Sequence, residues 1–297
     1  MFEKISTAGL SNMEWLKLRK QGIGGSDAGA ICGLNPYSSP MKVFWDKTTD
    51  EVEEQDNEAV RIGHDLEQYV AERFMEATGL KVRRSNYMYR SKAHPYMIAD
   101  VDRLVIGEDA GLECKTASAY TADKWVDGNI PLHYAMQCYH YMAVTGKRTW
   151  YIAAVILGRE FVYHKLTWDD ALIQRLIEVE GEFWNNHVMV NIIPDPDGSK
   201  ICDSVLEQYF HTAKKASMIE LVGLMTSWHA GRRFLHILRN CSRSRNRLSR
   251  KSNCLCRIMS WRQTSIIRYR GAMWIPQGLT RSASNRSSRK SMRIMQR

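Results

Sequence analysis

The stretch Met97–Ser118, MIADVDRLVIGEDAGLECKTAS, decides the fold of this chain. Two apolar, β-prone runs at 97–106 and 111–117 flank the residues of 107–110, Gly-Glu-Asp-Ala. Turn-forming residues between two such runs predict a β-hairpin. The strand period of two then determines which of the charged side chains in this stretch lie together.

Three carboxylates and one ammonium lie on the two predicted strands. Asp100 and Asp102 are two positions apart and are expected to share one face, as are Glu113 and Lys115. Paired strands would bring these groups together, and crowded carboxylates repel one another unless a cation neutralises them. Oxygen ligands of this kind suit Mg²⁺ or Mn²⁺. The alternative interpretation is a surface hairpin whose charges are simply solvated.

Composition supports one substantial domain with an appendage, because 297 residues with 44% apolar side chains can bury a core. The formal net charge of +10 is unevenly placed. Residues 221–297 contain 18 Arg and Lys and no Asp or Glu, which leaves residues 1–220 with a net charge of −8. The basic character of the chain therefore belongs to its C-terminal segment.

Cysteine usage and the first residues bear on the compartment. The seven cysteines, at 32, 114, 138, 202, 241, 254 and 256, are odd in number and include no C-x₂-C pair, so neither a disulfide framework nor a zinc site is expected. The start, MFEKISTAGL, lacks a basic-then-apolar signal pattern, and no apolar run reaches the ~18 residues of a membrane helix. We expect a soluble, cytoplasmic protein.

The order of patterns along the chain predicts three regions. Residues 1–195 alternate helical and strand patterns and are expected to form an α/β domain with a central mixed sheet flanked by helices. Residues 196–230 are interpreted as a helical extension. Residues 231–297 are rich in Arg and Ser without sustained periodicity, which is typical of segments that do not fold. A disordered or non-native tail, such as an out-of-frame extension, is preferred to a native DNA-binding arm.

Two polar elements precede the hairpin. A helix predicted at Asn12–Lys20 carries Arg19, and the glycine-rich turn that follows leads to Ser26 at the start of another helix. Free backbone N–H groups at such a turn suit an anion, although an ordinary helix cap is the alternative. An apolar stripe at Ile62, Leu66, Tyr69, Val70 and Phe74 predicts a longer helix that ends at Gly79. Glu67 borders this stripe.

The region after the hairpin predicts a helix, a second hairpin and a further helix. The helix is entered after Pro131 and ends at Gly146, with Tyr134, Gln137 and Tyr141 on one face. The hairpin consists of strands at 149–156 and 160–166 that turn about Gly158, and a helix at 169–188 is expected to pack over it.

These motifs together resemble a known family. An aspartate, roughly ten intervening residues and Glu-x-Lys form the signature of the PD-(D/E)xK nucleases, here Asp102 with Glu113 and Lys115. The sequence ADVD…GLECKTAS resembles that of the YqaJ-type phage recombination exonucleases, which are relatives of the lambda exonuclease. The other motifs match in order and spacing: Arg19-x₆-Ser26, Gly63-x-x-x-Glu67 and Tyr134-x-x-Gln137-x-x-x-Tyr141. The resemblance covers roughly residues 12–190.

The resemblance implies a restriction-endonuclease-like core and metal-dependent hydrolysis of DNA. It implies that Asp102, Glu113 and the carbonyl of Cys114 bind Mg²⁺ (or Mn²⁺), and that Glu67 completes this metal site directly or through water. It also implies that Lys115 and Gln137 orient the nucleophile. Arg19 and Ser26 are expected to hold a 5′-phosphate.

The resemblance also implies a reaction and partners. It implies 5′→3′ digestion of double-stranded DNA ends, a 3′ single strand left for a phage annealing protein, a homo-oligomer such as a ring, and no membrane. One alternative is a structure-selective endonuclease on the same scaffold. Another is a non-enzymatic nucleic-acid-binding protein that acts through the basic tail. An iron–sulfur nuclease is disfavoured, because the sequence has no group of four cysteines.

Overall fold

The computed structural model describes residues 2–50 and 57–209. The chain divides into two units after Pro194. In the second unit the described part holds helix α7 (Lys200–Tyr209), which lies within the region predicted as a helical extension. Residues 210–230 and the whole tail, 231–297, lie outside the described residues, and what the sequence predicts for them stays a prediction. No helix of the described part is long and apolar enough to cross a membrane.

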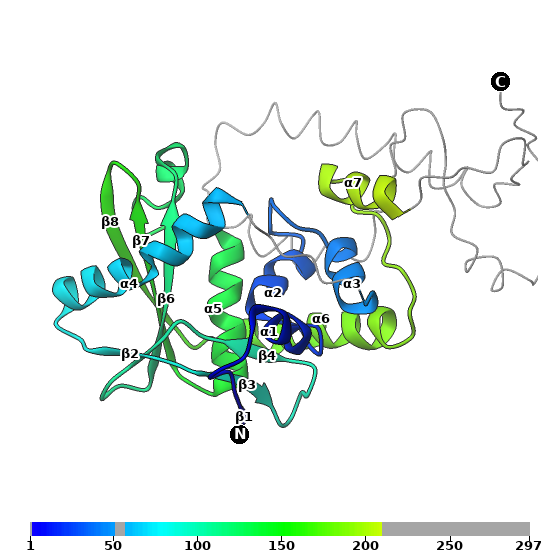
Figure 1. Cartoon of the computed structure of the whole chain (residues 1–297), viewed down its shortest axis with the longest axis horizontal. Coiled ribbons are helices and arrows are strands. Elements are labelled where there is room, and N and C mark those ends of the chain that lie inside the picture. Colours follow the sequence, from blue (N-terminus) through cyan, green and yellow to red (C-terminus); the bar gives the residue numbers. More distant parts are fainter. Residues whose placement is uncertain (1, 51–56, 210–297) are drawn as a thin grey trace, which may run out of the picture. The chain divides into compact units, whose positions relative to one another are not determined.

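The first unit contains both sheets and every described helix except α7 (Figure 1). Its elements in chain order are β1 (Phe2–Ser6), α1 (Asn12–Arg19), α2 (Gly25–Ile31), α3 (Pro40–Thr48), α4 (Glu58–Thr78), β2 (Val82–Arg84), β3 (Tyr87–Ser91), β4 (Ile98–Asp100), β5 (Arg103–Val105), β6 (Ala110–Ala117), the 3₁₀ helix η1 (Ala119–Lys124), α5 (Leu132–Thr145), β7 (Thr149–Ile156), β8 (Glu160–Thr167), α6 (Asp170–Phe183) and the π-helical turn η2 (Trp184–Val188).

The main sheet is mixed and covered by helices on both faces, as predicted. Its strand order is β2-β5-β6-β7-β8, and only β6 and β7 run parallel. Along β7, Trp150 and Ile152 pack with side chains of α5, whereas Tyr151 and Ala153 pack with side chains of α4. This alternation of buried residues follows from the strand period of two and explains why β7 carries no charged residue and is apolar or aromatic after Thr149.

The predicted hairpin is present, but its first strand is broken. β5 and β6 pair antiparallel around a turn that contains Gly107, whose φ is +83°. The single strand predicted at 97–106 is wrong, because β4 belongs to a second, three-stranded sheet of order β1-β3-β4. The chain crosses from one sheet to the other at Val101 and Asp102. Asp100 and Asp102 therefore do not share the face of one strand.

The later elements agree with the sequence except in one placement. β7 and β8 form the predicted hairpin around Gly158, and α5 ends at Gly146 in the left-handed conformation. The predicted helix 169–188 is α6 followed by the turn η2. Its residue Leu176 packs with Ala28 of α2 and Ala135 of α5, so α6 belongs mainly to a helical layer. It does not cover the hairpin, although Leu166 of β8 packs against the same cluster.

Two glycines bring α2 close to α5. A Cβ atom on Gly25 would lie 2.5 Å from the Tyr141 ring, and one on Gly29 would lie 2.8 Å from the Cβ of His133. Only glycine permits this approach without displacing α5. The glycine-rich sequence read as an anion-binding turn therefore also has a packing role.

A buried ion pair ties α5, α6 and β4 together. The Nδ1 atom of His140 lies 2.9 Å from a carboxylate oxygen of Glu180, and its Nε2 lies 2.8 Å from the carbonyl oxygen of Ile98. Both ring nitrogens face oxygen atoms, an arrangement that a doubly protonated imidazole beside a carboxylate satisfies. Burial alone would lower the pKa of His140, but the Glu180 charge and the two hydrogen bonds outweigh it and raise that pKa.

Replacing Glu180 by Gln should lower the free energy of unfolding by about 3 kcal/mol at pH 6, because it leaves a buried cation without its partner. The pKa of His140 is raised in the folded state from its ordinary 6.5, so its contribution is complete below pH 6.5 and disappears as the pH rises through the folded value. The cost of Glu180→Gln in urea unfolding should therefore shrink at alkaline pH. The exposed Glu178→Gln on the same helix is the control, and an equal pH dependence in both variants would contradict this account.

Candidate active site

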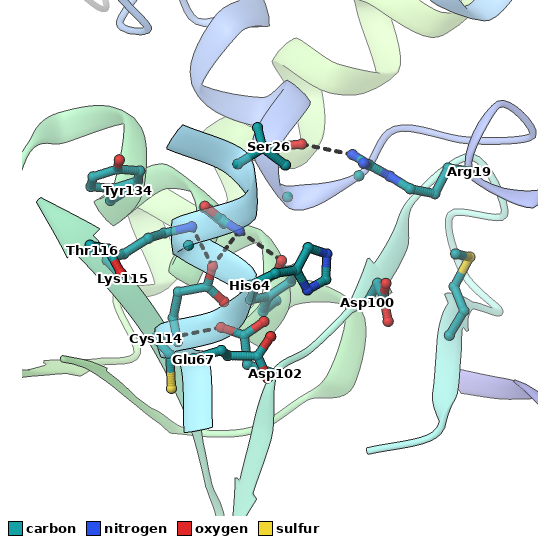
Figure 2. Close-up of a pocket in the computed structure, with 18 of the residues that line it drawn as sticks. Arg19, Ser26, His64, Glu67, Asp100, Asp102, Cys114, Lys115, Thr116 and Tyr134 are labelled. Atoms are coloured by element: carbon teal, nitrogen blue, oxygen red, sulfur yellow. Dashed lines mark hydrogen bonds and ion pairs between the residues drawn. The ribbon is translucent and has the colours of Figure 1, made fainter. Parts of the chain in front are cut away.

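A cavity of about 480 Å³ collects every predicted site residue (Figure 2). It is formed by α1, α2, α4, β4, β6 and α5, together with the crossover between the two sheets. Figure 2 shows Asp102, Glu67 and Lys115 gathered at one part of the cavity, with Arg19 and Ser26 at another. The residues predicted from sequence that line it are Arg19, Ser26, Glu67, Asp102, Glu113, Cys114, Lys115 and Gln137.

Strand β6 presents Glu113 and Lys115 on one face, as its period predicts. The Nζ of Lys115 lies 2.6 Å from Oε1 of Glu113. The thiol of Cys114 is buried on the opposite face, among the side chains that pack with α4, so only the backbone of this residue is available to the site. That backbone fixes the neighbouring acid, because the N–H of Cys114 donates to Oδ2 of Asp102 at 2.7 Å.

Helix α5 supplies the second partner of Glu113. The amide nitrogen of Gln137 donates to Oε1 of Glu113 at 2.7 Å and to the hydroxyl of Tyr141 at 2.8 Å. The other carboxylate oxygen of Glu113, Oε2, is buried and has no hydrogen-bond partner among the described residues. A buried carboxylate oxygen without a donor is costly and calls for a cation.

The acids of the cavity oppose one another's charge. Burial raises the pKa of Asp102 well above its ordinary value, and the charges of Glu113 and Glu67 raise it further. Burial would lower the pKa of Lys115, but the adjacent Glu113 and Asp102 carboxylates outweigh it and raise that pKa. The ammonium of Lys115 therefore offsets part of the charge of the two carboxylates.

The donor set fits a hard divalent cation. Mg²⁺ in proteins is commonly bound through one or two carboxylates with several waters. Asp102 and Glu113 are two such groups that line the cavity, and one oxygen of Glu113 has no hydrogen-bond partner among the described residues. Within residues 2–50 and 57–209, no three Asp, Glu, His or Cys side chains form a ready-made metal centre. The fit therefore rests on the two acids and the adjacent backbone.

Glu67 is held by cations. Its Oε1 contacts the guanidinium of Arg103, which is only 3% exposed, and lies 3.5 Å from the more exposed guanidinium of Arg84. The structure places Glu67 in the lining of the cavity, and its role at a metal site stays a prediction. Its link to Arg103 was not foreseen.

Arg19 and Ser26 are paired at the far part of the cavity. The guanidinium of Arg19 donates to the hydroxyl of Ser26 at 2.8 Å and stacks over the Trp15 ring at 5.0 Å. Trp15 in turn donates from Nε1 to Oδ2 of Asp100 at 2.7 Å. Asp100, which the sequence placed beside Asp102 as a further acid, is thus engaged with the helix that carries Arg19.

A buried lysine supports this arrangement from behind. Lys47, whose side chain is 1% exposed, pairs with Asp27 at 2.8 Å and donates to the backbone carbonyl of Arg19 at 3.0 Å. Asp27 also accepts from the N–H of Gly24 at 2.9 Å and so caps α2. The chain thereby holds α1, α2 and α3 together around Arg19.

Sequence reasoning missed Trp15, Lys47 and Arg103. Trp15 and Lys47 each fit an ordinary helix pattern, and nothing local distinguishes them from packing or surface residues. Arg103 carried a signal, because a charged residue inside an apolar strand must find a partner if the strand is buried. Its partner is remote in sequence, so the pattern alone could not identify it.

Comparisons with known proteins agree with this geometry. A family model for the YqaJ-like viral recombinase domain matches residues 14–148. The uncharacterized protein YqaJ of Bacillus subtilis (strain 168) is 40% identical over 215 residues, which are 71% of this chain and 67% of that protein.

Solved structures show the same fold at lower identity. An alkaline exonuclease from Laribacter hongkongensis, LHK-Exo, is 19% identical, with a TM-score of 0.53 over 61% of this chain and 94% of its own. Its complex with dAMP gives the same TM-score at 20% identity. This likeness confirms the predicted restriction-endonuclease-like α/β core.

Replacing Asp102 by Asn should stabilise the metal-free protein by about 1 kcal/mol, because it removes one of two neighbouring buried carboxylates and keeps an acceptor for the Cys114 N–H. Mg²⁺ should then raise the unfolding temperature of the wild-type protein and leave the variant nearly unchanged. Thermal unfolding in EDTA and in Mg²⁺ measures both effects. The exposed Asp123→Asn is the matched control, and equal stabilisation of Asp102→Asn and wild type by Mg²⁺ would contradict the assignment.

Proposed function

Because the chain belongs to the YqaJ-like viral recombinase family, we propose that it is a metal-dependent DNA exonuclease of phage-type recombination. The carrying observation is the Glu113 carboxylate, buried between Lys115 and Gln137 with one oxygen unpartnered among the described residues. An acid in this state destabilises the fold unless it serves a cation. The activity would reside in residues 1–195.

The acids would hold the ion and the neighbouring donors would orient the reactants. Asp102, Glu113 and the carbonyl of Cys114 would bind Mg²⁺, with Mn²⁺ as the alternative, and Glu67 would complete the site directly or through water. A divalent ion here would acidify a bound water and offset charge on the phosphate. Lys115 and Gln137, both in contact with Glu113, would orient that water toward the phosphodiester.

The pair of Arg19 and Ser26 supports digestion from a 5′ end. A guanidinium and a hydroxyl held 2.8 Å apart provide charge-assisted and neutral donors for a terminal phosphate. The pair lines the same cavity as the acids, so a strand bound by its 5′-phosphate would pass over the proposed metal ligands. Digestion of a duplex in the 5′→3′ direction would leave a 3′ single strand.

The product suggests the partners of the reaction. A 3′ single strand is what a single-strand annealing protein requires, and we propose such a phage protein as the partner. A homo-oligomer, such as a ring around the DNA, is proposed on the family resemblance and would keep the enzyme on its substrate. Mass measurement in solution tests this part independently.

In Mg²⁺, the wild-type protein should release label from the 5′ ends of a linear duplex and leave a covalently closed circle intact. A 3′-labelled duplex should lose its label last. Denaturing gels of end-labelled substrates measure both results. Cutting of the closed circle would favour the structure-selective endonuclease instead, and early loss of the 3′ label would reverse the polarity.

Asp102→Ala or Glu113→Ala should each abolish this cleavage and leave duplex binding largely intact. In this proposal the two residues contact the metal ion, and they contact neither the bases nor the sugar-phosphate backbone of the DNA. The double variant should be little worse than either single one, since the two acids act as a unit. Single-turnover cleavage and a gel-shift assay measure the two quantities. Undiminished cleavage by Asp102→Ala would remove the basis of the proposal.

Arg19→Ala should slow digestion of 5′-phosphorylated ends roughly 10- to 100-fold, the equivalent of about 1.5–3 kcal/mol of charge-assisted bonding. Ends with a 5′-hydroxyl should be digested almost as fast as by the wild type. Lys17→Ala removes an exposed cation from the same helix and is the control. Equal slowing on both kinds of end would mark Arg19 as a structural residue.

A further inference from the structure

Arg103 is a buried cation that directly follows a proposed metal ligand. Its side chain is 3% exposed and lies on the face of β5 toward α4, the same face as Val105. One guanidinium nitrogen contacts the carboxylate of Glu67 and donates to the backbone carbonyl of Asp102 at 2.8 Å. The other donates to Oε1 of Gln68 at 3.2 Å.

These contacts join two parts of the site that are far apart in the sequence. Glu67 lies on α4, and Asp102 lies at the crossover between the sheets. A planar guanidinium presents donors in a fixed fork, so it sets the distance and orientation between the groups it contacts. Both cations near Glu67 approach its Oε1, which leaves Oε2 for the cavity that Glu67 lines.

A packing role alone does not require a guanidinium at this position. Buried ion pairs can often be replaced by apolar side chains of similar volume without loss of stability. The neighbours Leu104 and Val105 satisfy the core with aliphatic groups. The charge of Arg103 is instead placed between the Glu67 carboxylate and the backbone of Asp102, two acids of the cavity whose charges repel each other.

We propose that Arg103 is a positioning residue for the metal site, which it builds by fixing the Glu67 carboxylate relative to Asp102. The inference rests on the proposed metal-dependent function. It assigns to Arg103 an effect on metal affinity that is transmitted through Glu67. Groups that orient metal ligands without touching the ion commonly contribute 10- to 100-fold to affinity.

The test is Mn²⁺ binding, followed by the electron paramagnetic resonance signal of free Mn²⁺, in the full-length protein without DNA. Arg103→Met keeps an unbranched apolar stem and removes the donors, and it should weaken Mn²⁺ binding roughly 10- to 100-fold. Arg103→Lys restores the charge but not the fork, and its loss should be smaller. Arg84→Gln is the matched control, because Arg84 carries the other guanidinium near Glu67 and its side chain is 64% exposed. This substitution should change the affinity for Mn²⁺ less than twofold.

Glu67→Gln and its combination with Arg103→Met identify the route. If Arg103 acts through Glu67, the double variant should bind Mn²⁺ about as weakly as the weaker single variant. Fully additive losses would overturn the inference, as would wild-type affinity in a folded Arg103→Met protein. If thermal unfolding shows that Arg103→Met does not fold, Arg103→Lys decides the matter, and unchanged affinity in that variant overturns the inference.

Cleavage of the end-labelled duplex, measured in parallel, separates this inference from the proposed function. A wild-type protein that binds Mn²⁺ in an Arg103-dependent manner but cuts no DNA would refute the nuclease and support the role of Arg103. A wild-type protein that cuts DNA while Arg103→Met binds Mn²⁺ normally would refute only the role of Arg103. Absence of Mn²⁺ binding by the wild type would overturn the inference itself.

Discussion

The site depends on one constraint, the burial of the Glu113 carboxylate beside Asp102. Burial raises the pKa of both acids, and the Glu113 charge raises the pKa of Asp102 further. Lys115 offsets part of this rise through a contact of 2.6 Å with Glu113. The alternation of side chains along β6 enforces this arrangement. It directs Glu113 and Lys115 to the face of the sheet toward α5, while the side chain of Cys114 packs on the opposite face. Local stability is thus exchanged for a strong attraction toward cations.

Close packing between α2 and α5 links the acids to the part of the cavity that contains Arg19 and Ser26. Gly25 allows α2 to approach Tyr141, and Tyr141 shares the amide of Gln137 with Glu113. The same helix α2 bears Ser26, the partner of Arg19. A displacement of α2 would therefore reach both the proposed phosphate ligands and the proposed metal ligands. The two parts of the site are therefore coupled through the packing of α2 on α5, although within residues 2–50 and 57–209 no ion pair joins Arg19 to Asp102 or Glu113.

Much of this could be predicted from the sequence, where local patterns decide. The period of two placed Glu113 and Lys115 together, and the glycines at 107, 146 and 158 ended elements correctly. The break at Val101 could not be foreseen, because the apolar pattern continues through it and only pairing with β3 separates β4 from β5. The contact of Glu67 with Arg103 joins residues 36 positions apart, and local periodicity carries no information at that range.

The crossover at Val101 and Asp102 also limits how the chain length can change. Ile98–Asp100 is paired in one sheet and Arg103–Val105 in another, and only two residues connect them. No unpaired loop is available there to accommodate an inserted residue. It would shift the register of one sheet and turn every side chain of that strand to the opposite face. The turn after β5 has no such double anchorage. Insertions and deletions should therefore be tolerated in the turn between β5 and β6, at residues 106–109, and should not be tolerated at Val101 and Asp102.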